Sequence, residues 1–282
     1  MLYKVTGLSI VLLLIFSACN LEKEIELELP DYDRQTVVES YLQPGQPFTV
    51  LLTRSDPFFA SFGTLNDQYL ENLLLDDAEV TISYANQTVT LRNDLFFNLQ
   101  TGKLYNYKSD NALVPEDFDT PFRLDIRTAA GETITAETRI TPPTPIDSLV
   151  IEFQANNDTL ARVLTYVSDD LNAVNFYRRI FLTGSDRFVD QDFAVDDELL
   201  DSESFVFGTG YDFNPGDTVT SIFSQINEDY YRFINSVQNA VDSNGNPFGQ
   251  PSVIISNVEG DRNPIGIFTG FVQDEVMRIV PD

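Results

Sequence analysis

The chain has 282 residues, with 44 acidic and 17 basic side chains and a formal net charge of −27, and it contains no histidine, no tryptophan and a single cysteine. This acidic excess repels phosphate backbones, so we expect no nucleic-acid binding. The missing histidine excludes histidine general bases and Ser-His-Asp triads. A single cysteine cannot form an internal disulfide or a cysteine-bound zinc site, and the missing tryptophan disfavours a sugar-stacking platform.

The first nineteen residues predict export and a lipid anchor. Lys4 precedes an apolar run from Leu8 to Phe16, and two small residues, Ser17 and Ala18, stand before Cys19. This is the pattern of a secretory signal peptide over residues 1–18, and its apolar run is too short to span a bilayer. The segment resembles a lipobox, which implies lipidation of Cys19 at the new N-terminus. The alternative is an ordinary signal peptide with Cys19 unmodified.

Residues 19–30 are expected to form a lipidated tether that continues into a first strand. The stretch Asn20–Pro30 reads NLEKEIELELP, in which glutamates alternate with leucine and isoleucine. Alternation with a period of two is typical of a half-buried strand. The acidic patch after Cys19 also resembles the surface-export signal of Bacteroidota lipoproteins, although a charged edge strand explains it as well. We therefore expect an outer-membrane, lipid-anchored protein facing the cell surface, with a periplasm-facing anchor as the alternative.

Residues 31–141 are predicted to form an N-terminal β-sandwich domain. A hairpin is expected around Ala85-Asn86, and a Pro-Gly turn at 43–46 separates the first two strands. The strands are expected at 36–42, 48–53, 78–84, 87–92, 103–107, 122–127 and 132–140. Short strands at this spacing predict an antiparallel sandwich.

One long segment of this domain, residues 54–74, has no steady hydrophobic period. Its aromatic side chains are Phe58, Phe59, Phe62 and Tyr69. A long aromatic loop on a β-scaffold is a frequent place for binding, so these four residues form a possible partner-binding loop. The alternative is a loop folded back to cap the sandwich.

Three prolines within Thr141–Pro145 predict a stiff domain boundary, because proline cannot donate a ladder hydrogen bond. Residues 142–282 are then a C-terminal β-rich domain. Its strands are expected at 148–154, 159–167, 174–182, 204–207, 218–223, 266–272 and 275–280. In the third of these, the adjacent Arg178 and Arg179 must point to opposite faces. The acidic run Asp190–Glu203 is interpreted as a solvated loop.

One amphipathic helix is predicted in the second domain, near residues 225–241. Ser224 is the expected N-cap, and Glu228 and Asp229 suit the positive end of the helix dipole. The apolar stripe consists of Ile226, Tyr230, Phe233, Ile234, Val237 and Val241. We expect this stripe to pack on the C-terminal sheet; an exposed docking surface is the alternative.

Several short motifs resemble one known family. They are Val37-Val-Glu39, Pro44-Gly45, Arg54-Ser-Asp-Pro-Phe58, Glu228-Asp-Tyr-Tyr231, Gly245-Asn-Pro-Phe248, Pro251, Ser256-Asn257 and Gly266-Ile-Phe268. In this order they resemble a family of Bacteroidota outer-membrane lipoproteins known as domain of unknown function 4249, over nearly all of the chain after the signal. The resemblance implies an accessory protein of TonB-dependent receptors with an immunoglobulin-like or transthyretin-like first domain. It supplies no catalytic residues.

No cofactor is expected, with calcium as the weak alternative. Asp242, Asn244 and Asn246 have the opening rhythm of a calcium loop, but Pro247 stands where the loop needs glycine and Val253 where it needs glutamate. The acidic run is a second place where a divalent ion could bind: it contains Asp190, Asp192, Asp196, Asp197 and Glu198. Solvated side chains explain that run more simply.

The sequence favours a non-catalytic protein over an enzyme. Paired carboxylates could hydrolyse a glycosidic bond, but no pair stands out among 44 acidic residues, and no Gly-x-Ser-x-Gly elbow or P-loop occurs. The expected role is an accessory or binding subunit of a TonB-dependent receptor or another outer-membrane complex. A surface hydrolase using paired carboxylates and a free-standing adhesin-like binding module remain the alternatives.

Overall fold

The computed structural model describes residues 33–55, 67–98, 102–170, 172–198, 202–243 and 253–282. Strands account for most of this part of the chain, so the prediction of a mainly β protein is confirmed. Residues Arg34–Asp282 form one compact unit. The signal peptide and the acidic tether lie outside the described residues.

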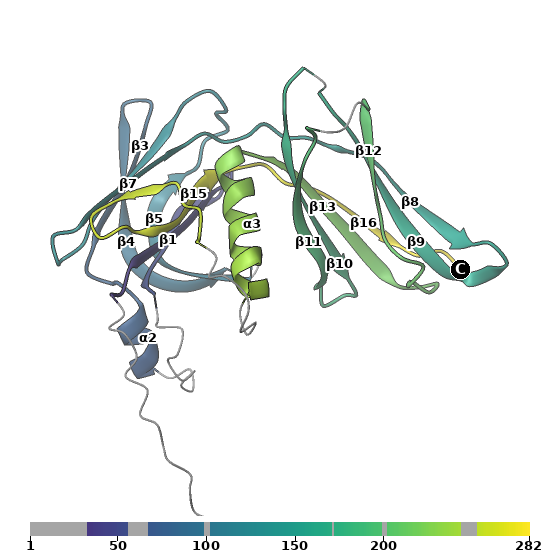
Figure 1. The fold of residues 1–282 in the computed structure, drawn as a ribbon, viewed down its shortest axis with the longest axis horizontal. Helices are drawn as coiled ribbons and strands as arrows, with labels where there is room; N and C mark the ends of the chain where they lie inside the picture. The colour runs from purple at the N-terminus through teal and green to yellow at the C-terminus, as the bar shows by residue number, and fades with distance from the viewer. Residues whose placement is uncertain (1–32, 56–66, 99–101, 171, 199–201, 244–252) are drawn as a thin grey trace, which may run out of the picture. The chain divides into compact units, whose positions relative to one another are not determined.

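The largest element is a nine-stranded sheet (Figure 1). Its strands, in their order across the sheet, are β14 (Val258–Gly260), β7 (Thr133–Thr138), β6 (Phe122–Arg127), β3 (Glu79–Tyr84), β4 (Gln87–Asn98), β5 (Lys103–Leu113), β2 (Pro47–Arg54), β1 (Thr36–Leu42) and β15 (Ile265–Gly270). All its neighbours are antiparallel except β1 and β15, which are parallel. The predicted hairpin turn is confirmed, because Ala85 and Asn86 both have positive φ, at 44° and 61°.

The two ends of this sheet approach each other, so the sheet is nearly closed. The side-chain amide of Asn257, just before β14, donates to the carbonyl of Phe268 in β15 and accepts from its N–H, at 2.8 and 2.9 Å. Ser256 Oγ accepts the N–H of Gly266 at 3.1 Å, and the N–H of Thr141 donates to the carbonyl of Gly270. The side chains of Ser256 and Asn257 and the backbone N–H of Thr141 thus satisfy backbone groups on the side of β15 that faces away from β1.

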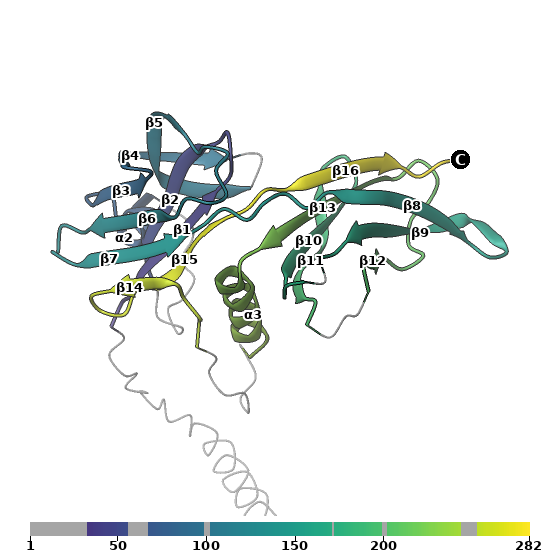
Figure 2. The same ribbon diagram turned by 90° about the horizontal axis from the view of Figure 1, so that it is seen from above.

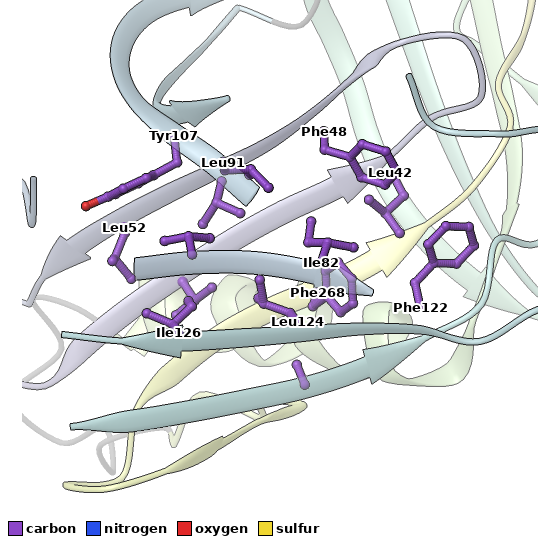
Figure 3. Packing of buried hydrophobic residues seen from close by; sticks show 14 of the residues in the cluster. Leu42, Phe48, Leu52, Ile82, Leu91, Tyr107, Phe122, Leu124, Ile126 and Phe268 are labelled. Atoms are coloured by element: carbon purple, nitrogen blue, oxygen red, sulfur yellow. The ribbon is translucent and has the colours of Figure 1, made fainter. Parts of the chain in front are cut away.

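Inside the curved sheet lies the largest hydrophobic core. Alternate residues of β1, β2, β3 and β6 point inward, as period-two strands require, and Phe268 of β15 joins them (Figure 3). Leu42, Phe48, Ile82, Leu124 and Phe268 are completely buried. Burying each such side chain stabilises the fold by about 1.5–3 kcal/mol, so the core holds β15 in the sheet.

Two smaller sheets follow. The four-stranded sheet has the order β11 (Phe188–Asp196), β10 (Phe176–Thr183), β13 (Thr218–Ile226) and β16 (Asp274–Ile279), and the three-stranded sheet has the order β12 (Ser204–Gly208), β9 (Asn157–Ser168) and β8 (Ile146–Gln154). Both sheets contribute to two shared buried clusters, one around Phe181 and Val163 and one around Phe223 and Phe205. Chain segments far apart in sequence therefore form one interior here.

Two strands from the expected second domain pair within the sheet of the first domain. β14 and β15 lie beyond residue 142 yet belong to the nine-stranded sheet, while β16 belongs to the four-stranded one. Figure 2 shows the yellow segment passing from β15 into β16. A hydrophobic strand pattern predicts that a segment is extended but not which strand it pairs with, so the sequence could not reveal this exchange.

The helix α3 (Glu228–Ser243) confirms the predicted helix, but its N-cap is Asn227 and not Ser224. Ser224 is buried inside β13, whereas Asn227 Oδ1 accepts the N–H of Tyr230 at 2.9 Å. The Asn227 amide also donates to the hydroxyls of Thr138 and Thr269. The start of α3 is thus attached to β7 and β15.

The expected stripe of α3 is only partly buried, and it does not pack on a single sheet. Tyr230 is buried, Phe233 and Ile234 are half-buried, and Val241 is 60% exposed. The helix contacts β15 of the large sheet and both β10 and β11 of the four-stranded sheet. A second helix, α2 (Asp67–Leu73), lies in the segment expected to be a loop.

The acidic run was also interpreted wrongly as a loop, because its first half is β11. The missed signal is the alternation of Phe193 and Val195 with polar residues. Its carboxylates are engaged by neighbouring elements: Asp192 pairs with Arg178, and Asp197 accepts the backbone N–H and the amide of Asn175. These pairings offset the cost of desolvating the carboxylates, so an acidic segment can form a strand here.

Candidate functional site

A groove of about 680 Å³ lies between the nine-stranded and four-stranded sheets, a volume typical of small-molecule sites. One wall comes from β1, β2, β4 and β5, and the other from β10, β13 and the β10–β11 turn. Tyr230 of α3 and Phe271, just after β15, join the two walls. The same contacts that attach α3 to both sheets therefore determine the width of the groove.

Three aromatic rings form the end of the groove beside α3. The rings of Tyr230 and Phe271 stack with centroids 5.5 Å apart and planes at 11°. Tyr41 of β1 packs on both, at 5.6 and 6.3 Å. Aromatic contacts of this kind contribute about 0.5–1.5 kcal/mol each beyond simple burial, so this end of the groove is rigid.

A cation lies on each side of these rings. Arg178 donates to the Tyr230 hydroxyl at 2.6 Å and binds Asp192 with two parallel hydrogen bonds of 2.8 and 2.6 Å. Lys103 Nζ donates to Glu39 at 2.8 Å and to the Tyr41 hydroxyl at 3.0 Å. Planar two-point pairing fixes a guanidinium firmly, so the charges at this end of the groove are fixed in position.

Burial determines how these phenols titrate. Burial raises the pKa of Tyr230 to about 12, although the charge of Arg178 acts in the opposite direction. Burial, followed by the nearby Tyr230 and Glu39, raises the pKa of Tyr41 well above its ordinary value. Burial by itself lowers the pKa of Arg178, but the hydrogen bond to Asp192 and the electrostatic interactions with Tyr230, Asp192 and Tyr41 together outweigh burial, so the pKa is raised. At neutral pH both phenols are therefore protonated and Arg178 is charged.

A cation of a different kind, on β5, also lines the groove. Lys108 Nζ lies 4.9 Å from the ring centroid of Phe96, and Phe96 stacks on Tyr105 with centroids 5.6 Å apart. Within the described residues Lys108 has no carboxylate in ion-pair range. Phe97 beside it is 56% exposed.

Basic side chains are concentrated in the groove, although the whole chain has a net charge of −27. Four of its described lining side chains are cations, namely Lys103, Lys108, Arg178 and Arg187, whereas Asp186 is the one carboxylate among them. Lys103, Arg178 and Arg187 are each paired with a carboxylate, which compensates their charge. The attraction of the groove for an anion therefore depends on Lys108.

The match to a family model decides the family. The model described as Domain of unknown function (DUF4249) matches residues 22–276. The chain belongs to the DUF4249 family. No protein in a comparison with curated proteins matches the chain.

The motifs that suggested DUF4249 have structural roles where the structure describes them. Ser256 and Asn257 form the seam of the large sheet. Gly266 has φ +141°, and a Cβ there would lie 1.8 Å from the carbonyl oxygen of Val38. Only glycine allows such an approach of β15 to β1. Tyr230, from the Glu228–Tyr231 motif, additionally lines the groove.

The predicted site residues of this DUF4249 chain are not among the side chains that the structure describes. Cys19, Phe58, Phe59 and Phe62 lie outside the described residues, and Tyr69 lies in α2 with a side chain that is likewise not described. Sequence reasoning missed the groove because its lining comes from seven separated segments. The available signal was Arg178, whose opposite orientation to Arg179 is confirmed.

Metal sites can be judged only where side chains are described. In that part of the chain no cluster of three or more acidic, cysteine or histidine side chains is arranged to hold a metal ion. Asp242 accepts a hydrogen bond from Gln238 at 2.9 Å, while Asn244 and Asn246 lie outside the described residues. No helix in the described segments is long and apolar enough to cross a membrane.

One carboxylate with a raised pKa, Asp169, lies outside the groove lining. Burial, opposed by the hydrogen bond from Tyr177 and aided by the neighbouring Asp197, raises the pKa of Asp169. Asp169 accepts the Tyr177 hydroxyl at 2.6 Å, and Asp197 accepts two hydrogen bonds from Asn175 at 2.8 Å. Each carboxylate thus anchors the turn before β10, which is a structural role.

Proposed function

We propose that this chain is a non-catalytic, lipid-anchored binding protein of the outer membrane, facing the cell surface, and an accessory or binding subunit of a TonB-dependent receptor or another outer-membrane complex. The observation that carries the binding role is the groove, in which cations and aromatic rings gather on an acidic chain. Sites that recognise a ligand combine such apolar walls with a few polar groups that orient it.

The anchoring part of the proposal rests on the N-terminal segment. A basic residue, an apolar run and small residues precede Cys19, as in a lipobox. Stable anchoring by lipid takes two acyl chains, or one chain with a second signal. The Bacteroidota origin and the link to TonB-dependent receptors come from the family likeness.

The proposal also covers the architecture of the N-terminal and C-terminal parts of the chain. Strands β8–β13 and β16 form a sandwich-like part, a proposal supported by the two buried clusters that both small sheets share. The immunoglobulin-like or transthyretin-like character of the first part stays a prediction.

Purification of the native complex tests the accessory role. The chain is tagged at its C-terminus in the source bacterium, extracted in mild detergent and recovered by affinity. We expect an outer-membrane protein to be recovered with it in stoichiometric amount. Repeated recovery of the tagged chain alone would refute the accessory role.

Substitution of the lipidated residue tests the anchor separately. Cys19→Ala is expected to release the chain from the membrane fraction while its melting curve stays unchanged, because Cys19 lies before the compact unit Arg34–Asp282. Membrane fractionation with the unmodified chain as control measures this. Firm attachment of the Cys19→Ala chain would show that the lipid is not the anchor.

A further inference from the structure

Lys108 contacts the ring of Phe96, but its ammonium has no ion-pair or hydrogen-bond partner in the described part of the chain. It is half-buried on β5, and no described carboxylate or carbonyl forms an ion pair or hydrogen bond with it. Lys103, Arg178 and Arg187, by contrast, are each paired with a carboxylate. A partly desolvated ammonium without a partner is stabilised when an anion binds beside it.

Amide and aromatic groups line the same groove. The side-chain amide of Gln46 has no hydrogen-bond partner among the described residues. Within the same part of the chain, the side-chain amides of Gln43 and Gln273 bond only to each other, at 3.1 Å. An amide both donates and accepts, which matches a ligand rich in hydroxyl groups. The chain has no tryptophan to form a broad sugar-stacking platform, so stacking here depends on the single exposed ring of Phe97, which offers a flat apolar face to the C–H face of one sugar ring.

The topology of the walls argues against an extended peptide as ligand. Peptides that bind sheets add a strand to a free edge. Six of the wall strands, β1, β2, β4, β5, β10 and β13, are inner strands with a neighbour on each side, and the edge strand β11 contributes only Val189 to the described lining. A long polyanion is disfavoured too, because the surrounding chain is strongly acidic.

We propose that the groove binds a short anionic oligosaccharide, whose carboxylate or sulfate group pairs with Lys108 while a sugar ring stacks on Phe97. Hydroxyl groups of the sugar bond to the amides of Gln46, Gln43 and Gln273. This inference rests on the proposed binding role and names its ligand class. The two proposals can be refuted separately, since copurification with a membrane protein does not require that the groove binds a glycan.

Calorimetric titration of the full chain in detergent tests the ligand class. The probes are trigalacturonate, a sulfated carrageenan oligosaccharide, neutral maltotriose and triglutamate. We expect one anionic sugar to bind at least roughly tenfold more tightly than maltotriose and triglutamate, as a charge-assisted hydrogen bond requires. The tighter of the two anionic sugars identifies the source as carboxylated or sulfated glycan. Equal binding of maltotriose or triglutamate, or no saturable binding of either anionic sugar, would overturn the proposal.

Matched variants locate the site. Lys108→Glu is expected to weaken binding roughly tenfold or more, whereas Arg127→Glu makes the same charge change on the exposed face of β6 and should leave binding unchanged. Phe97→Ala should weaken binding several-fold, and Leu95→Ala, an exposed neighbour outside the groove lining, should not. Melting curves confirm folding, and Lys108→Gln replaces Lys108→Glu if the latter unfolds. Equal affinity of the Lys108 variant and its Arg127 control would place the sugar elsewhere.

Discussion

Tyr230 of α3 is the side chain whose removal should most directly separate a structural brace from a docking surface. Its ring is 2% exposed and lies between Phe271 and Tyr41. Its hydroxyl accepts a hydrogen bond of 2.6 Å from Arg178. One residue of the helix thus contacts β1, the end of β15 and β10.

Two contributions determine the cost of Tyr230→Ala. Deleting a fully buried aromatic ring costs about 3–5 kcal/mol, cavity included. Losing a hydrogen bond to a charged donor adds about 1–2 kcal/mol, at the lower end because Arg178 keeps both bonds to Asp192. The expected loss is about 4–6 kcal/mol, which lowers Tm by roughly 10–20 °C in a chain of this size.

Guanidinium unfolding followed by circular dichroism measures the loss, and two controls separate its parts. Tyr230→Phe keeps the stacked ring and removes the hydroxyl, so it should cost only about 1–2 kcal/mol. Val241→Ala, at the exposed end of the same helix, should stay within about 0.5 kcal/mol. Phe233 is half-buried, so Phe233→Ala should fall between the two alanine variants.

Equal stability of the Tyr230→Ala and Val241→Ala variants would refute the reasoning. It would mean that α3 does not pack as described and that its aromatic side faces a partner. A Tyr230→Phe variant as unstable as Tyr230→Ala would instead refute the assignment of most of the energy to the ring.

Three further predictions concern the free energy of unfolding. Gly266→Ala should lower it by more than about 3 kcal/mol, because the new Cβ would meet the Val38 carbonyl. Gly131→Ala, at φ +85° with open space around it, should lower it by about 1 kcal/mol in the same melting assay; equal losses would contradict the close approach of β15. Because the pKa of Asp169 is raised in the folded state, wild-type stability falls as pH rises from the unfolded pKa through the higher folded pKa. Asp169→Asn should therefore be more stable than wild type by less than about 1 kcal/mol at pH 7, and its stability should depend less on pH in melts from pH 3.5 to 7; a variant less stable than wild type at pH 7 would contradict this prediction. Burial lowers the pKa of Arg179 to about 10 and leaves two of its nitrogens without described partners, so Arg179→Met should be neutral or stabilising by about 1–4 kcal/mol in chemical unfolding; a loss of several kcal/mol would reveal a partner for the guanidinium.

Much of the local structure followed from the sequence, because strand and turn signals are local. Most predicted strands are present within a few residues, and the hairpin turn lies at Ala85-Asn86 as predicted. The amphipathic helix is present as well, although Asn227 replaced Ser224 as its cap. The cap was misplaced because β13 continues through Ser224, and the pairing of that strand overrides a local capping preference.

The groove and its binding residues could not be read from the sequence in the same way. Lys108 and Phe97 lie in one hairpin, but Arg178 and Tyr230 come from segments much later in the chain. A charge or an aromatic ring in isolation has no predictable partner. Phe58, Phe59 and Phe62 of the predicted aromatic loop lie outside the described residues, and the end of that segment is the helix α2. Its role as a partner-binding loop stays a prediction.

The sequence by itself determined the β-rich character, the hairpins, the helix and the opposite orientation of Arg178 and Arg179, because these depend on periods of two and 3.6 residues. Tertiary structure decided that β15 joins β1 in parallel, more than two hundred residues away, and that the seam is closed by Asn257. Strand pairing between distant segments depends on core packing and on backbone fit at Gly266, and neither leaves a local pattern. The groove exists because that long-range pairing brings Phe271 and α3 between the two sheets.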